Sequence, residues 1–360
     1  MSLTQTISRR VLRPAVAALT SPHGIDRYLE VANPMWALDD VRARVVHVRR
    51  EAPDVTTLAL RPTSTWRGFR AGQHVLVGVE VDGARRTRCF SISSSEAGGR
   101  DALTITVRAH EAGLVSKYLA ARAEPGLVLH LSQAQGDFTL PDTLPDRLLM
   151  ISGGSGITPL MSMLRTLTDQ GYDGRIRFIH YSRSAEHTIF GRELAELSAS
   201  HHGIELSVVH TRAGGTRFTA EQLCRLAPDY AKTDTFACGP AGLVEQVRQA
   251  YADVDAEDRL QVEFFKTSTI AADPANAEGS LSFSRSGRAA ANTGGTLLEQ
   301  AEALGLRPEY GCRMGICFSC TSRKHEGTVR NVVTGAASHL PDEDIQLCVT
   351  TPVGDCAVEV

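Results

Sequence analysis

Residues 311–320 read GCRMGICFSC, and the spacing of the cysteines in this stretch decides how the last part of the chain folds. Cys312 and Cys317 are separated by four residues, Cys320 follows after two more, and Cys348 comes 28 positions later. A C-x4-C-x2-C run with one distant cysteine is the ligand spacing of plant-type 2Fe-2S clusters. We therefore expect these four cysteines to hold such a cluster. Structural zinc, which favours paired C-x2-C knuckles or histidines, and buried free cysteines are the alternatives.

The residues around this cysteine loop form a unit of their own. A strand-like run covers residues 281–286, and a helix is expected to open at Thr296, because Glu299 stands three places later in the capping-box arrangement. The preceding segment, 267–279, is small and polar and contains proline, which is typical of a linker. We therefore expect a separate domain at 280–360.

Upstream of the linker, between residues 146 and 266, apolar runs alternate with helical patterns. The runs cover residues 148–151, 177–180, 206–210 and 235–237. This alternation is typical of a doubly wound α/β domain with a parallel sheet. The first run enters a glycine turn, GGSGITP at 153–159, which differs from G-x-G-x-x-G but performs the same physical task. Its glycines let a pyrophosphate approach the backbone at a helix N-terminus, with Thr158 expected as N-cap and Pro159 as the first helical residue.

The segment from residue 40 to 145 has a different pattern of apolar and polar residues. Short runs rich in valine, threonine, leucine and isoleucine, at 41–48, 55–61, 74–81, 103–107 and 127–131, are separated by glycine, proline or aspartate. Strands at this spacing predict an antiparallel barrel or sandwich. Only residues 113–121 have a helical pattern in this segment.

With the cysteine loop and this domain order in place, the chain resembles a known family. Residues 280–360 resemble a plant-type ferredoxin, and the chain from about residue 40 resembles the ferredoxin-NADP reductase superfamily, in the branch that serves oxygenases and desaturases. The resemblance implies FAD, with FMN as the alternative, a 2Fe-2S cluster, and NADPH as substrate. It divides the chain into an N-terminal extension (1–39), a flavin-binding antiparallel β-barrel (40–145), an NAD(P)H-binding doubly wound domain (146–266), a linker (267–279) and an α+β β-grasp ferredoxin domain (280–360).

Two motifs in the barrel segment match the flavin-binding pattern of this family. In the R-x-F-S motif the arginine can pair with a phosphate, the phenylalanine can stack on the isoalloxazine ring and the serine can reach its polar edge. The G-x-x-S motif that follows leaves N–H groups free for pyrophosphate oxygens at a helix start. The residues are Arg88, Cys89, Phe90 and Ser91 in the first motif, and Gly113, Leu114, Val115 and Ser116 in the second.

The family resemblance also assigns residues to the nicotinamide nucleotide. Thr158 and Pro159 would lie against the nicotinamide ring, and the thiol of a C-G-P motif at the end of the fourth run would help position it, although a buried inert cysteine is the alternative there. Cations after the second and third runs suit a 2′-phosphate, and no acid follows the second run, which favours NADPH over NADH. The residues are Gly153, Gly154 and Gly156 in the turn, Cys238, Gly239 and Pro240 in the C-G-P motif, and Ser182, Arg183 and Arg212 at the strand ends.

Together these parts predict an electron-transfer oxidoreductase. NADPH delivers two electrons as a hydride, the cluster accepts one at a time, and a flavin converts between the two. Thr158 and Cys238 are expected to position the reacting ring, and Phe265, in the run Glu263-Phe264-Phe265, to shield the flavin or lie on the path to the cluster, with core packing as its alternative. The chain carries no H-x-x-H-type di-iron set or haem-ligand motif, so we expect another protein to be the terminal oxidant.

The first 39 residues give an indication of which protein accepts the electrons. Residues 23–28 and 33–36 are similar to the N-terminal extension of mycobacterial reductases that serve membrane acyl-CoA desaturases, which implies a desaturase partner and a docking role for this extension. The stretch 1–25 carries three arginines and no acid, so peripheral membrane contact is the alternative to a plain surface helix. A reductase for a ring-hydroxylating or haem monooxygenase, a cluster-based redox sensor and a zinc-stabilised flavoprotein are the competing functions.

Composition limits the remaining possibilities. The 360 residues hold 38 Lys+Arg against 41 Asp+Glu, a net charge of −3, which excludes a nucleic-acid binder that works through a basic surface. Cysteines clustered at unequal spacings in so long a chain point to a metal centre in a reducing compartment rather than to a disulfide framework. No apolar run is long enough to span a bilayer. We expect a cytoplasmic protein that can also work at a membrane surface.

Overall fold

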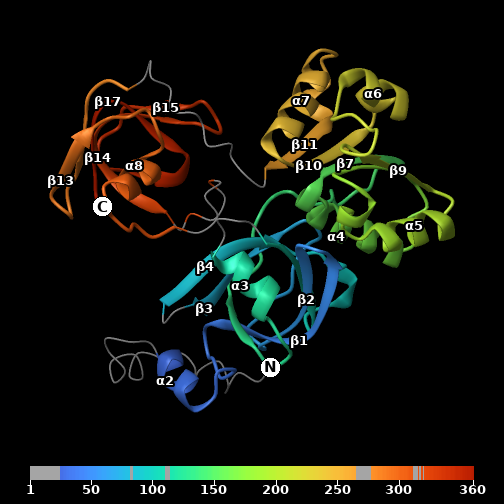
Figure 1. Ribbon diagram of the computed structural model, residues 1–360, viewed down its shortest axis with the longest axis horizontal. Coiled ribbons are helices and arrows are strands. Elements are labelled where there is room, and N and C mark those ends of the chain that lie inside the picture. Colours follow the sequence, from blue (N-terminus) through green and yellow to red (C-terminus); the bar gives the residue numbers. More distant parts are fainter. Residues whose placement is uncertain are drawn as a thin grey trace.

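Three β-sheets in sequence order organise the computed structural model (Figure 1). The structure describes residues 25–81, 84–109, 114–264, 277–310, 315, 318 and 320–360. The first sheet is antiparallel and the second is parallel, while the third mixes both pairings around a short helix. This confirms the predicted fold class, an antiparallel barrel followed by a doubly wound domain and a ferredoxin domain.

The first sheet is the barrel, with strand order β4-β3-β6-β1-β2-β5. Valine and leucine side chains at alternate positions fill its interior. One helix, α3 (Leu114–Arg122), packs against β3, β4 and β5. The strands are β1 (Val41–Ala52), β2 (Val55–Pro62), β3 (His74–Val81), β4 (Ala84–Ser91), β5 (Leu103–Arg108) and β6 (Val128–Leu131).

Strand β4 is the element of the barrel that the sequence pattern did not predict. Its sequence, ARRTRCFS, has three arginines in the first five positions and no apolar alternation. It is nevertheless a strand, because it pairs along its whole length with the predicted strand β3, from Val81 opposite Ala84 to His74 opposite Ser91. As the edge strand of the sheet it can carry charge on its exposed side.

The second sheet is parallel, with strand order β11-β10-β7-β8-β9 and helices on both faces. Alternate residues of β7 belong to two different cores: Leu148 and Met150 pack with α4 and α5, whereas Leu149 and Ile151 pack with α6 and α7. The strands are β7 (Arg147–Gly153), β8 (Arg175–Ser182), β9 (Ile204–His210), β10 (Asp234–Gly239) and β11 (Leu260–Phe264). The helices are α4 (Ile157–Asp169), α5 (Gly191–Ser200), α6 (Ala220–Leu226) and α7 (Ala241–Ala252).

The barrel and the parallel sheet share one hydrophobic core. Ala52, Val55 and Phe138 of the barrel side belong to the same buried cluster as α4, and the ring of Phe138 meets that of Phe236 on β10 edge to face, with 5.6 Å between centroids. A continuous core of this kind fixes the two units against each other. The flavin and nucleotide motifs are thus held in one relative position.

The third sheet belongs to the cysteine domain, residues 280–360. Its order is β13-β12-β17-β14-β15, with β12 parallel to β17 and with β16 paired to β14. Helix α8 (Leu297–Ala303) covers the sheet, and its start confirms the predicted capping box: Thr296 Oγ1 accepts from the Glu299 N–H, and the Glu299 carboxylate accepts from the Thr296 N–H. The strands are β12 (Ser280–Phe283), β13 (Arg288–Ala291), β14 (Thr321–Asn331), β15 (Ala337–Ser338), β16 (Glu343–Gln346) and β17 (Thr350–Val358).

Part of the N-terminal extension is fixed to the barrel. Helix α2 (Ile25–Ala32) is followed by a turn that is held by the Asp26 carboxylate, which accepts from the N–H groups of Leu38, Asp39 and Asp40. These hydrogen bonds keep the pKa of Asp26 below its usual value although burial opposes them. Arg42 of β1, fully buried, donates to the carbonyls of Asp26 and Pro34. Across the described ranges, no helix has the length and apolar character needed to cross a membrane.

Candidate functional site

The two flavin motifs lie on neighbouring elements of the barrel. Arg88, Cys89 and Phe90 are half-buried on β4, and Ser91 is buried at its end. Helix α3 packs against this strand and begins with the second motif, in which Leu114 is exposed while Val115 and Ser116 are buried. Gly113 lies outside the described residues. The fold therefore places the strand that carries R-x-F-S against the helix that begins with the second motif.

The glycine turn after β7 lies directly against the C-G-P motif. A Cβ atom on Gly156 would come within 2.2 Å of the Cys238 carbonyl oxygen, and one on Gly153 would come within 2.6 Å of the Leu243 side chain. Gly154 has a φ of +55°, a conformation that favours glycine. Only glycines permit this close packing of Gly156 and Gly153 at the carboxyl end of β7 and β10, where ligands of doubly wound sheets bind.

The expected cap of the following helix is wrong. Helix α4 begins at Ile157 with Gly156 as N-cap, so that Thr158 lies inside the first turn and Pro159 is the third helical residue instead of the first. The reason is a short 3-10 helix, η2 (Gly154–Gly156), whose carbonyls already receive the Ile157 N–H and start the helix without a side-chain cap. Thr158 is buried and donates to the Ser155 carbonyl at 3.0 Å. Pro159 is tolerated because first-turn N–H groups have no intrahelical partner.

Cys238 and Glu263 are buried side chains on β10 and β11, beside the glycine turn. They stand opposite each other in the register of β10 and β11. Burial raises the pKa of the Cys238 thiol well above its usual value, so the group is an uncharged packing surface and not a nucleophile. Burial also raises the pKa of Glu263 to about 8, so its carboxyl group is protonated near neutral pH. Phe265, two residues on, lies outside the described residues.

The expected 2′-phosphate residues occupy neighbouring strand ends. Ser182, the last residue of β8, is buried and hydrogen-bonds to Thr188 Oγ1 at 2.8 Å, which leaves the next residue, Arg183, to face solvent. Arg212 follows β9 and is also exposed. Among the described residues neither arginine forms an ion pair, so both guanidinium groups are open to an anion. Their role in binding a 2′-phosphate stays a prediction.

The sequence analysis missed Arg108, the last residue of β5. Its Nη1 lies so close to Gly154 that a Cβ atom there would be 2.9 Å away, and its Nε stands 3.3 Å from the Asp54 carboxylate. Burial and the nearby Arg183 lower its pKa, although Asp54 opposes them. A desolvated cation over a glycine turn fits a pyrophosphate. Its signal in the sequence is a basic residue directly after the apolar run 103–107, a pattern shared with many surface arginines.

His180, on strand β8 next to the central strand β7, is a second polar residue beside this turn. Its Nδ1 lies 2.7 Å from Ser152 Oγ, and burial together with Arg108 and His210 lowers its pKa to about 3. The ring is therefore neutral. Within the described part of the chain its Nε2 is buried without a hydrogen-bond partner. A buried polar atom of this kind indicates that water or a bound group completes the site.

Two of the four predicted cluster ligands are described, and they are adjacent. Cys320 and Cys348 are buried, and the Cys348 N–H points at the Cys320 sulfur at 3.5 Å. An N–H directed at sulfur stabilises a thiolate, as cluster ligands require. Gly315, with a φ of +77°, packs against Val349, and its carbonyl accepts from Gln346 Nε2 at 2.7 Å. Cys312 and Cys317 lie outside the described residues. The donors that are described fit a 2Fe-2S cluster.

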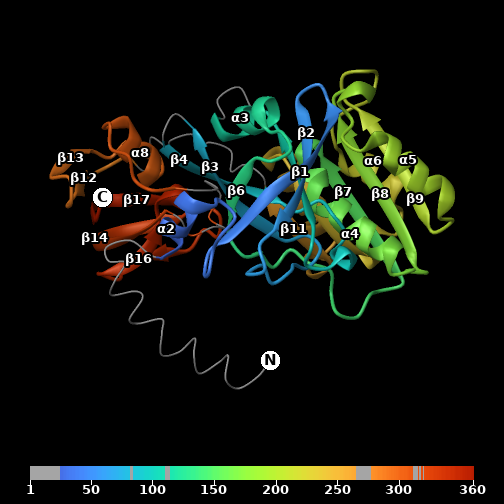
Figure 2. The ribbon, with the colours of Figure 1, turned by 90° about the horizontal axis from the view of Figure 1, so that it is seen from below.

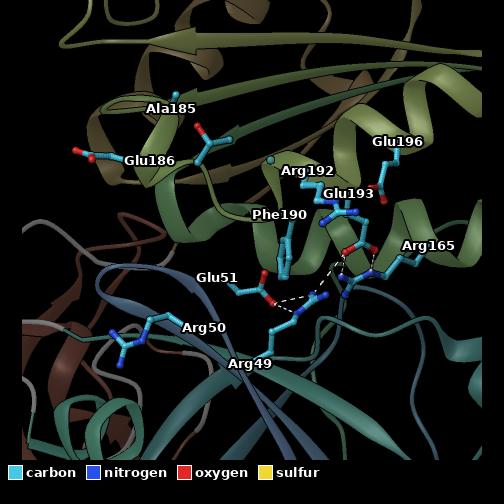
Figure 3. Close-up of a pocket in the computed structure, with 12 residues that line it drawn as sticks. Arg49, Arg50, Glu51, Arg165, Ala185, Glu186, Phe190, Arg192, Glu193 and Glu196 are labelled. Atoms are coloured by element: carbon cyan, nitrogen blue, oxygen red, sulfur yellow. Dashed lines mark hydrogen bonds and ion pairs between the residues drawn. The ribbon is translucent and has the colours of Figure 1, made fainter.

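A cavity of about 850 Å³ lies elsewhere, between the end of β1 and helix α5 (Figure 3). Most of its charged side chains are paired with one another: Arg165 donates to the Glu193 carboxylate through Nε at 2.7 Å and Nη2 at 2.6 Å, stacks on Phe190, and reaches the Ser93 carbonyl of the barrel. Arg49 pairs with Glu51. None of the predicted site residues lines this cavity. One of its ion pairs, between Arg49 Nη2 and Glu193 Oε2 at 3.8 Å, joins the barrel to the doubly wound domain.

Comparison with known proteins agrees with this organisation. Residues 42–140 match the family "Oxidoreductase FAD-binding domain", residues 150–249 match "Oxidoreductase NAD-binding domain", and residues 284–353 match "2Fe-2S iron-sulfur cluster binding domain". An NADPH oxidoreductase of Mycobacterium tuberculosis is 39% identical over 97% of this chain and 92% of its own length. A glycine betaine monooxygenase reductase subunit of Chromohalobacter salexigens is 30% identical over 91% and 98%. The fold is similar to that of phthalate dioxygenase reductase, with a TM-score of 0.61 at 21% identity over 89% of this chain and 98% of that one.

Proposed function

Because this chain belongs to the ferredoxin-NADP reductase superfamily and carries a C-terminal 2Fe-2S ferredoxin domain, we propose that it is the NADPH-dependent reductase of an oxygenase system. When bound, FAD accepts the hydride of NADPH and the cluster passes on single electrons, so that one NADPH yields NADP⁺, a proton and two electrons for the acceptor. The protein itself binds these groups next to one another, in the order in which electrons pass, and excludes water from the reacting atoms.

The observation that supports this proposal best is a contact between two residues that are the cross-strand partners of the flavin motif and of the C-G-P motif. His74 pairs with Ser91 across β3 and β4, and Glu263 pairs with Cys238 across β10 and β11. His74 Nδ1 lies 3.9 Å from Glu263 Oε1, and both side chains are buried. A nicotinamide ring bound near Cys238 and a flavin bound near Ser91 would therefore be neighbours, as hydride transfer requires.

Each residue of the nucleotide site has a physical role in this proposal. Gly154 and Gly156 bring backbone N–H groups to the pyrophosphate, and Arg108 supplies the opposing charge. Thr158 and Cys238 are both buried and border the place proposed for the nicotinamide ring. Neither side chain is a base that could compete for a proton there. Glu263, protonated near neutral pH, holds a proton at the edge of the flavin site.

We propose a membrane fatty acyl-CoA desaturase as the electron acceptor. Support comes from the extension, where four large apolar side chains are exposed around the rigid turn held by Asp26: Tyr28, Val31, Trp36 and Leu38, between 50% and 87% exposed. Exposed apolar residues grouped on a fixed element are typical of a surface that docks a partner. In this role the described part of the extension contacts the desaturase or the membrane beside it.

A soluble oxygenase is the second candidate acceptor. It is favoured by relatives whose names describe reductase subunits of glycine betaine monooxygenase and of 3-ketosteroid-9-alpha-monooxygenase, at 30% identity over 91% and 92% of this chain. In that case the exposed side chains of the extension have no part in electron delivery.

Anaerobic spectroscopy tests the electron chain first. One equivalent of NADPH should bleach the flavin bands and the cluster shoulder together, whereas bleaching of flavin alone in a protein that contains iron would refute the chain. Zinc without iron would support a zinc-stabilised flavoprotein. Absence of rapid NADPH-dependent cytochrome c reduction would favour a redox sensor.

A reconstituted assay then separates the two acceptors. NADPH-driven desaturation of stearoyl-CoA by desaturase-containing membranes should fall in Trp36→Ser and Val31→Ser, whereas ferricyanide reduction by these variants should be unchanged. Equal desaturation by the variants and the wild-type protein would refute docking through the extension. Failure of the wild-type protein to support desaturation would favour the soluble oxygenase.

A further inference from the structure

A contact between Arg88 and Tyr310 joins the flavin motif to the cysteine domain. The guanidinium carbon of Arg88 lies 4.8 Å from the centre of the Tyr310 ring, and Nη2 donates to the Tyr310 hydroxyl at 3.3 Å. Tyr310 also packs against the hydrophobic core of its own domain. Figures 1 and 2 both place the β4 edge of the barrel next to this domain. The two residues are 222 positions apart in the sequence, so the contact is a docking contact between domains.

The geometry leaves Arg88 able to bind an anion at the same time. A guanidinium group has five N–H donors in one plane. Nη1 donates to the neighbouring Thr87 carbonyl at 2.7 Å and Nη2 to Tyr310, while one face of the plane covers the aromatic ring. For Nε–H and the second N–H of each Nη atom the described residues supply no hydrogen-bond acceptor, so these donors can bind a phosphate while the contact with the ring is kept.

Tyr310 also stands immediately before the cysteine loop. The chain from residue 310 to residue 312 can span at most about 7 Å. A fixed position for Tyr310 against the barrel therefore limits how far the loop can be from the flavin motif.

We infer that Arg88 and Tyr310 form a clasp that docks the ferredoxin domain on the flavin site, and that one arginine serves both the flavin phosphate and the cluster domain. Tyr310 is a positioning residue: it fixes the distance over which single electrons pass from flavin to cluster, with no bond made or broken. The inference rests on the proposed function, because it assigns the clasp to the flavin-to-cluster step.

Tyr310→Leu is the decisive variant, since leucine keeps an apolar contact with the ferredoxin core but removes both the stacking and the hydroxyl. Tyr310→Phe keeps the ring, and Arg285→Ala, an exposed residue of the same domain, is the matched control. Each holoprotein would be mixed with NADPH in an anaerobic stopped-flow instrument while flavin and cluster absorbance are followed separately. Small-angle scattering of the oxidised holoproteins reports docking independently of turnover.

In Tyr310→Leu, flavin bleaching should keep its wild-type rate, whereas cluster reduction should slow about tenfold, the factor expected when one cation–π contact and one hydrogen bond are lost. The radius of gyration should increase in this variant alone. Tyr310→Phe should lie close to wild type. Cluster reduction at the wild-type rate in Tyr310→Leu, with an unchanged radius of gyration, would overturn the clasp. If NADPH fails to reduce the cluster of the wild-type protein, the proposed function itself fails.

Discussion

Arg212 donates its backbone N–H to the carbonyl of Arg183 at 3.0 Å, so two exposed cations stand side by side at the carboxyl ends of β8 and β9. A hydrogen bond between the two backbones fixes the spacing of the side-chain origins. Two guanidinium groups at such a spacing suit a phosphate dianion better than a neutral ribose hydroxyl.

We therefore predict that Arg183→Ala and Arg212→Ala each raise the KM for NADPH about tenfold, which corresponds to the loss of one charge-assisted hydrogen bond. The KM for NADH should change less than twofold. Steady-state ferricyanide reduction with each coenzyme measures both values, and Arg192→Ala, on an exposed arginine paired with Glu196, serves as the control. An equal loss with both coenzymes would contradict a role in 2′-phosphate recognition.

The pH dependence of stability should reveal the buried Glu263. The pKa of Glu263 in the folded protein is about 8, above its ordinary value of 4.5. Between these two pH values the folded state holds a proton that the unfolded state has released. The free energy of unfolding then falls as the pH rises. Glu263→Gln, which is neutral at every pH, should remove this loss.

The measurement is the Tm of the FAD-loaded proteins between pH 6 and pH 9. The Tm advantage of Glu263→Gln over the wild-type protein should grow up to about pH 8 and then level off, because above that pH both the folded and the unfolded wild-type protein have lost the proton. Glu186→Gln, on an exposed carboxylate, should give a constant difference. Parallel curves for Glu263→Gln and the wild-type protein would show that Glu263 does not titrate in this window.

How far the sequence predicts this molecule depends on whether a signal is local. The capping box at Thr296 and the strand at 74–81 follow from residues next to each other in the chain, and the structure has both. Strand β4 does not, because its arginines conceal it and only pairing with β3 makes it a strand. The Thr158 cap is wrong because a 3-10 turn, a choice of backbone conformation, starts the helix two residues earlier than predicted.

The candidate site shows the same division. Spacing alone predicts the glycine turn and the cysteine loop, which are contiguous motifs. Arg108, His74 and Tyr310 gain their significance from residues far away in the sequence, at Gly154, Glu263 and Arg88. Such contacts depend on how the three domains pack against one another. The sequence pattern within a single segment therefore cannot predict them.

The close packing of Gly156 yields a third prediction. A Cβ at this position meets backbone atoms of Cys238 and Gly239 within 2.5 Å, and backbone cannot move aside as a side chain can. Gly156→Ala should therefore destabilise the holoprotein by about 1–3 kcal/mol and slow flavin bleaching by NADPH. Gly242→Ala, in helix α7 with open space around it, is the control and should be neutral or stabilising. Wild-type stability and bleaching in Gly156→Ala would show that the turn is looser than its packing indicates.

The last prediction concerns Phe318, between the second and third predicted cluster ligands. Its φ of +55° is a left-handed conformation that bulky residues rarely adopt, and its side chain is 67% exposed, so ring burial offsets little of the cost. The turn is held because the Phe318 carbonyl accepts from the Thr321 N–H at 3.1 Å and from its hydroxyl at 2.7 Å. Phe318→Gly and Phe318→Ala both remove the ring, but only glycine relieves the backbone. The glycine variant should therefore be more stable than the alanine variant by about 1 kcal/mol. The half-life of cluster absorbance in guanidinium chloride measures the difference under identical loading. A longer half-life for Phe318→Ala would mean that the left-handed turn is not retained when the cluster is bound.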